Sequence, residues 1–178
     1  MAKENPLASN LTLEQQKNLF GNAYLNMLWH CPTDQRFPYW VHLPDCYYDE
    51  KDPHYKLLVI IHGTGCAVED YVRHAKELAD RDHVAVLAPL FPGGLIQRDD
   101  FNSYKLLSCD GVRYDQILLD MIDDMAKRYP GVETDKFFLF GHSGGGQFVN
   151  RFLFAHPEKL RACAIGAPGR PTFLNPDE

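Results

Sequence analysis

The sequence predicts an α/β fold with a mostly parallel sheet and helices on both of its faces. Two observations carry this prediction. Short continuous apolar runs, such as residues 57–61, alternate with longer stretches whose apolar residues recur at helical spacing. Strands that are apolar without alternation are typical of parallel sheets covered on both faces. The 178 residues are enough for one domain with a sizeable core.

The first expected element is a helix over residues 12–29. Its apolar residues fall near helical spacing, and Thr12 with Gln15 fits a capping box. Because this helix precedes the alternating pattern, residues 1–35 are predicted to form an N-terminal helical extension and residues 36–178 the α/β core. We expect the helix to pack on its own sheet, and a role as a dimer helix is the alternative.

The core is expected to begin with a strand over residues 39–43, which a proline ends. The loop between residues 89 and 111 is long for a compact domain, and such loops are commonly functional. The remaining expected elements are strands over 56–62, 83–88, 136–140 and 161–166, and helices over 69–79, 111–129 and 143–155.

Composition and charge exclude several classes of function. The net charge is −6, and no run of lysine or arginine stands out, which argues against nucleic acid or an anionic membrane as a partner. No apolar run approaches the roughly 20 residues of a membrane span, and the polar N-terminus lacks a secretory signal. Five widely spaced cysteines without a C-x-x-C pattern predict neither a metal site nor disulfides, and therefore a cytoplasmic protein.

The strongest local pattern is Gly141-His142-Ser143-Gly144-Gly145, which follows a predicted strand and opens a predicted helix. G-x-S-x-G in this setting is typical of a nucleophile elbow, a sharp turn that raises a serine hydroxyl above the sheet. Glycine at the flanking positions avoids a Cβ clash, and the helix N-terminus supplies a positive dipole. The alternative is a glycine-rich turn that binds phosphate. We predict Ser143 as a catalytic nucleophile.

A second glycine-containing turn, His62-Gly63-Thr64-Gly65, follows the apolar strand at residues 56–61. Acyl transfer needs N–H donors for the oxyanion. In elbow enzymes one donor follows the nucleophile, here Gly144, and the other lies in the loop after an earlier strand. Thr64 is the first candidate for that second donor and Gly65 the alternative. The residues expected to support the two turns are His62, Gly63, Gly141 and His142.

With both turns placed, the chain resembles the N-terminal part of an α/β-hydrolase-fold enzyme of the serine esterase and lipase type. The resemblance covers about residues 36–170 and includes the strand exit at 88–92 and the stretch 155–169 behind the elbow. It implies hydrolysis of a carboxylic ester, thioester or amide through Ser143, without a metal or organic cofactor. It also places the loop 91–110 near the active site, where it would shape the acyl pocket.

The chain departs from the family in the rest of the catalytic triad. The family orders its triad as serine, then acid, then histidine. The only histidine after Ser143 is His156, 13 residues further along a predicted helix and so roughly 20 Å away. The resemblance ends after the sixth strand of the family, before the strands that carry the usual acid and histidine. No catalytic base is therefore expected in this chain, and His62 is expected to orient its loop.

Three interpretations of this departure stay open. The chain is a fragment of a longer hydrolase, a half-domain completed by a partner chain or a second copy, or a degenerate hydrolase kept for binding or assembly. A partner would cover the apolar strand edge at residues 161–166. A non-hydrolytic biosynthetic member of the fold is a further alternative. Hydrolysis of a small-molecule ester or related acyl substrate is the preferred function.

Overall fold

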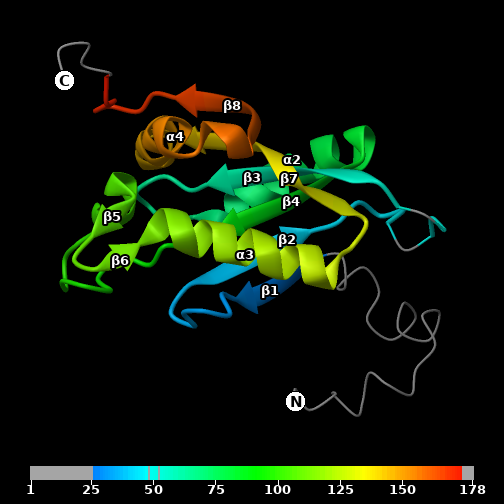
Figure 1. Cartoon of the computed structure of the whole chain (residues 1–178), viewed down its shortest axis with the longest axis horizontal. Coiled ribbons are helices and arrows are strands. Elements are labelled where there is room, and N and C mark those ends of the chain that lie inside the picture. Colours follow the sequence, from blue (N-terminus) through cyan, green and yellow to red (C-terminus); the bar gives the residue numbers. More distant parts are fainter. Residues whose placement is uncertain (1–25, 48, 52, 174–178) are drawn as a thin grey trace.

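The structure is a computed structural model of the chain, and it describes residues 26–173 apart from residues 48 and 52. Within this part, six strands form one sheet and two short strands form a hairpin (Figure 1). In chain order the elements are β1 Asn26–His30, β2 Pro38–His42, β3 Tyr55–Ile61, α2 Val68–Asp82, β4 Val84–Pro89, the 3₁₀ helix η2 Ser103–Leu106, β5 Ser108–Cys109, β6 Val112–Arg113, α3 Tyr114–Arg128, β7 Val132–His142, α4 Gly144–Ala155, the 3₁₀ helix η3 Pro157–Lys159 and β8 Leu160–Gly166.

The main sheet has the strand order β1-β2-β4-β3-β7-β8. Strands β4, β3, β7 and β8 run parallel to one another, whereas β2 is antiparallel to β4 and β1 is antiparallel to β2. The prediction of a mostly parallel sheet is confirmed. Because the carboxyl ends of β3 and β7 lie side by side, the turns that follow these two strands meet at one edge of the sheet.

Helices cover both faces of the sheet, which explains why its central strands are apolar without alternation. Successive side chains of a strand point to opposite faces. Val59 and Ile61 of β3 join the larger hydrophobic cluster, which includes Phe148 of α4 and residues of α3. Ile60 joins a smaller cluster with Val72 of α2. Figure 1 shows α3 crossing in front of the strands.

The helix predicted over residues 12–29 is wrong for residues 26–29, which lie in β1; residues 12–25 are outside the described part of the chain. The side chains of Met27 and Trp29 are half-buried and those of Leu28 and His30 are exposed, the alternation of a strand with one covered face. The Trp29 indole donates a hydrogen bond to the Tyr129 hydroxyl at 3.0 Å. The α/β core therefore begins before residue 36, where the sequence placed its boundary.

The long loop between β4 and α3 is more ordered than the sequence indicated. It contains η2 and the β5-β6 hairpin, and the pairing of Val112 with Cys109 delays the start of α3 to Tyr114. Phe91 stacks on Tyr104 of η2 and on Phe148 of α4, with ring centroids 5.5 and 5.4 Å apart. These contacts hold η2 against the helix that follows Ser143.

Candidate active site

Ser143 lies at the turn between β7 and α4 with φ 55° and ψ −118°. This conformation is uncommon for a residue with a side chain, and it persists only where the surroundings hold it. The Ser143 N–H donates to the carbonyl of Gly166 in β8 at 2.9 Å, and the Ser143 carbonyl accepts from the N–H of Gln147 at 3.1 Å. The side chain itself is half-buried.

Two glycines of this turn are required because backbone passes close to them. A methyl group placed on Gly145 would lie 2.2 Å from the carbonyl oxygen of Ile61 at the end of β3. One placed on Gly141 would lie 2.4 Å from the carbonyl oxygen of Gly145. Both distances are far below van der Waals contact, so the first turn of α4 approaches β3 and β7 as only glycine permits.

The two turns that the sequence singled out are brought together. A methyl group placed on Gly63 would lie 3.8 Å from Ser143 Cβ, and one placed on Gly144 would lie 2.9 Å from Thr64 Oγ1. Thr64 and Gly65 are exposed, and no heavy atom lies within 4 Å of the position that a Gly65 methyl group would take. The loop 62–65 therefore borders the serine turn on its accessible side.

His62 is buried, with 1% of its surface exposed, and both of its ring nitrogens are engaged. The N–H of Phe91 donates to Nε2 at 3.0 Å, so Nε2 carries no proton, and Nδ1 donates to the Gly63 carbonyl at 2.6 Å. Burial lowers the pKa of His62, and the nearby Lys105 charge acts in the same direction. The neutral ring thus ties the loop after β3 to the end of β4 and has no free nitrogen for Ser143.

His62 predicts a pH dependence of stability. Its pKa in the folded chain lies below the ordinary value of 6.5, so below that pH the unfolded chain binds more protons. The free energy of unfolding is expected to be highest above pH 6.5 and to fall on acidification. His62→Gln should flatten this slope between pH 7.5 and 5 in urea titrations. His74→Gln, at an exposed histidine, is the matched control and should leave the pH dependence of the free energy of unfolding unchanged. If His62→Gln also left this pH dependence unchanged, the lowered pKa of His62 would not be its source.

Lys105 is a site residue that the sequence reasoning missed. It comes from η2 and is 6% exposed, and its Nζ donates to Thr64 Oγ1 at 2.8 Å and to Asn102 Oδ1 at 2.6 Å. Burial lowers its pKa, although Asp100 acts in the opposite direction. Across the described residues, no carboxylate lies within ion-pair distance of this ammonium. Its only sequence signal was its place in the long loop, because a single lysine forms no motif.

The other histidines near the pattern do not serve Ser143. The side chain of His142, one of the residues expected to support the two turns, is exposed. His156 directly follows α4, and its Nε2 lies 2.9 Å from Asp115 Oδ2. Arg113 forms an ion pair with the same carboxylate. Burial alone would raise the pKa of Asp115, but hydrogen bonds from Arg113 and His156 bring it to about 2. In the described part of the chain, no side chain hydrogen-bonds to Ser143 Oγ.

One group of side chains has the composition of a metal site. Cys46, Glu50 and His83 each bring a ligand atom within 4.8 Å of the others. His83 directly precedes β4, so this group lies at the amino ends of the parallel strands, opposite the edge that carries Ser143.

In the described residues, no helix is both long enough and apolar enough to span a membrane.

Solved structures that are similar to this chain include two hydrolases and a depolymerase. Poly(aspartic acid) hydrolase-1 from Sphingomonas sp. KT-1 matches with a TM-score of 0.67 and 19% identity, over 84% of this chain and 58% of that one. The fluorophosphonate-binding serine hydrolase FphF from Staphylococcus aureus matches with a TM-score of 0.63 and 22% identity, over 79% and 55%. LpqC, a poly(3-hydroxybutyrate) depolymerase from Bordetella parapertussis, matches with a TM-score of 0.64 and 19% identity, over 88% and 56%.

These likenesses establish the fold of the chain. No protein-family model matches the sequence, and no curated protein matches it. The match covers 55 to 58% of the length of the three similar structures, so the chain spans a little more than half of each. The chain has the α/β-hydrolase fold over that part.

Proposed function

We propose that the chain carries the nucleophile of a serine hydrolase that acts on carboxylic esters or related acyl bonds. The observation that carries this proposal is the backbone of Ser143, held at φ 55° on a turn that also contacts the loop 62–65. Such a conformation costs on the order of 1–3 kcal/mol and clusters at sites where it serves a function. The turn joins a strand to a helix, as a nucleophile elbow does.

In the proposed reaction, Ser143 Oγ attacks the substrate carbonyl and the developing oxyanion is held by backbone N–H groups. The N–H of Gly144, in the first turn of α4, is one proposed donor. The second is the N–H of Thr64 or of Gly65. Lys105 supports this arrangement because it fixes the Thr64 hydroxyl and adds a positive charge beside the oxyanion.

The proposed mechanism still needs a general base, and the described residues supply none. We propose that the base and its acid come from a segment that pairs with the outer edge of β8. Among the described residues, no strand pairs with that edge, and the side chains of Ala162 and Ala164 in β8 are exposed. The segment is either a further part of a longer chain, a second polypeptide or a second copy. An unpaired parallel edge favours such an addition.

All five cysteines are free: Cys31 is buried, and the other four are half-buried. Thiols of this kind persist where glutathione and thioredoxin keep proteins reduced. Their state supports the proposal that the chain works in a reducing compartment such as the cytoplasm.

Covalent modification by a fluorophosphonate tests the proposed nucleophile. Ser143 should be labelled at least about a hundredfold faster than a free serine, because N–H donors alone retain roughly a thousandfold over water. The exposed Ser108 is an internal control in the same chain, and both rates can be followed by peptide mass spectrometry. The Ser143→Ala variant should lose the fast modification. Equal rates at Ser143 and Ser108 would refute the hydrolase and favour a binding module with the same fold.

A further inference from the structure

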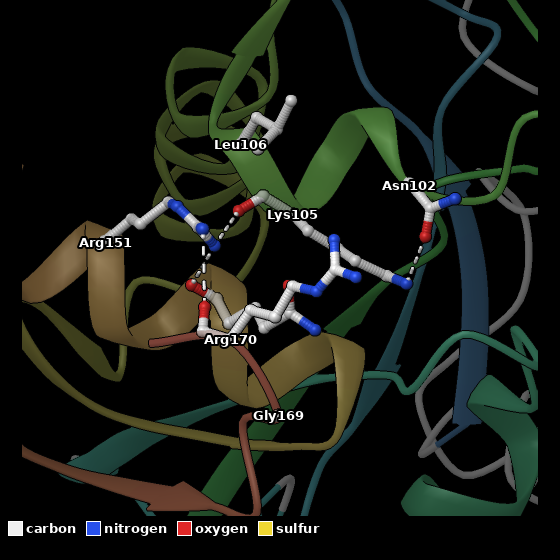
Figure 2. A pocket seen from close by; sticks show the side chains of 7 residues that line it. Asn102, Lys105, Leu106, Arg151, Gly169 and Arg170 are labelled. Carbon is white, nitrogen blue, oxygen red and sulfur yellow. Dashed lines mark hydrogen bonds between the residues drawn. The ribbon is translucent and has the colours of Figure 1, made fainter. Parts of the chain in front are cut away.

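A pocket of about 750 Å³ borders the candidate active site (Figure 2). Figure 2 shows its wall formed by η2, by α4 and by the segment after β8. Three of its side chains are cationic and none is a carboxylate. The lining residues are Asn102, Lys105, Leu106, Gln147, Arg151, Gly169 and Arg170.

The pocket lies along one face of α4, where Gln147 and Arg151 line it. Gly144, Gln147 and Arg151 are spaced three and four residues apart, so they share that face. At 1.5 Å per residue, Gln147 and Arg151 lie roughly 6 and 12 Å beyond Ser143 along the helix. Lys105 closes the near end, because a methyl group on Gly144 would lie only 2.7 Å from its Cε.

Among the described residues, the cations of this pocket form no ion pair with a carboxylate. The Arg151 guanidinium donates only to backbone carbonyls, those of Lys105 at 2.9 Å, Gln147 at 3.2 Å and Arg170 at 3.4 Å. Burial lowers the pKa of Arg151. Over the residues that the structure describes, no carboxylate forms an ion pair with Lys105, Arg151 or Arg170. The chain as a whole has 24 acidic and 18 basic residues, so this group of three cations contrasts with its net negative charge.

We propose that this pocket binds an anionic oxygen group of the substrate, so that the preferred substrates are acyl compounds carrying a negative charge roughly 6–12 Å from the scissile carbonyl. A guanidinium matches a carboxylate or a phosphate through parallel N–H···O bonds, and a half-buried cation gains most from such a partner. This inference rests on the proposed function, because it assigns the substrate class of the same site.

Direct binding tests the pocket without any chemistry at Ser143. Glutarate, its neutral analogue glutaramide and inorganic phosphate are titrated calorimetrically into the Ser143→Ala chain. Glutarate should bind and glutaramide should not, and 1 M NaCl should weaken the glutarate complex because salt screens the charges. Tighter binding of phosphate than of glutarate would support the anion site and assign it to phosphate. Equal binding of glutarate and glutaramide, or binding of neither anion, would overturn the proposal.

Variants locate the site. Arg170→Gln and Arg151→Gln should each weaken glutarate binding by about tenfold or more, the size of one charge-assisted hydrogen bond. Arg170 is exposed, and its guanidinium donates no hydrogen bond within the described residues, so its replacement leaves the fold intact. Arg73→Gln is the matched control, since Arg73 is exposed on α2 and pairs with Asp70. Equal affinity in all three variants would place the anion elsewhere and contradict the assignment.

Acylation of the wild-type chain separates this inference from the proposed function. In each reaction, Ser143 Oγ forms a bond to the acyl carbon, the ester C–O bond breaks, p-nitrophenolate leaves and the serine proton passes to buffer. The p-nitrophenyl monoester of glutaric acid should acylate Ser143 about tenfold faster than p-nitrophenyl pentanoate, and Arg170→Gln should remove the difference. Equal rates would overturn the inference alone. Failure of Ser143 to react with either ester would contradict the proposed hydrolase function. The calorimetric titration with glutarate would still test whether the pocket binds an anion.

Discussion

Hydrolysis of p-nitrophenyl acetate by the 178-residue chain alone is expected to be about a millionfold slower than hydrolysis by a serine hydrolase with a complete triad. A serine hydroxyl is a weak nucleophile at its free pKa and needs an adjacent base. The described residues offer Ser143 no hydrogen-bonding base, and His62 uses both ring nitrogens elsewhere. Only the contribution of the N–H donors, roughly a thousandfold over water, should remain.

The measurement is the release of p-nitrophenolate by protein that size-exclusion chromatography shows to be monomeric, with Ser143→Ala as the control. Added imidazole should accelerate the Ser143-dependent part, because it supplies the missing base from solution. A complementing segment that pairs with β8 should restore turnover far more. Fast Ser143-dependent turnover by the monomer without imidazole would mean that a base has been overlooked, and His62→Gln would then be the first variant to test.

Replacement of Gly145 by alanine is expected to destabilise the chain by about 3 kcal/mol, the upper end of the range for an overpacked core. The new methyl group would meet the carbonyl oxygens of Ile61 and His62 at 2.2 and 2.7 Å. Both are backbone atoms, so no side-chain rotation can relieve the contact. For a chain of this length, the midpoint of thermal unfolding should fall by roughly 6–12 °C, as measured by circular dichroism.

Gly65→Ala is the matched control for this stability measurement. No heavy atom lies within 4 Å of the position that its methyl group would take, and its φ is not positive. Its melting temperature should therefore stay within about 2 °C of the parent value, since a surface substitution without new contacts changes stability by less than about 0.5 kcal/mol. A Gly145→Ala chain as stable as Gly65→Ala would mean that α4 does not approach β3 as closely as described.

The central sheet could be predicted because its strands carry their signal locally. Residues 57–61 are apolar at every position, since Ile60 faces one hydrophobic cluster while Val59 and Ile61 face the other. Strand β1 could not be found in this way. It is a half-covered strand of five residues, and its apolar side chains also fit the helical spacing of the stretch before it.

Ser143 and the loop 62–65 could be located because glycines mark both turns. Lys105 and Arg151 could not, since each owes its position to tertiary structure. Lys105 reaches Thr64 only because Phe91 and Tyr104 stack the long loop on α4, and Arg151 faces the pocket only because η2 lies above it. Charged residues without a motif are ordinarily solvated, so the sequence alone gave no reason to choose them.

Three consecutive glycines, Gly144 to Gly146, open α4, and each costs about 1 kcal/mol relative to alanine inside a helix. This segment has little inherent tendency to form a helix. The geometry of Ser143 is instead imposed by remote parts of the chain, through the Gly166 carbonyl of β8 and the end of β3. Substitutions in β3 or β8 would therefore alter the backbone geometry of Ser143 even if all residues of the G-x-S-x-G motif stayed unchanged.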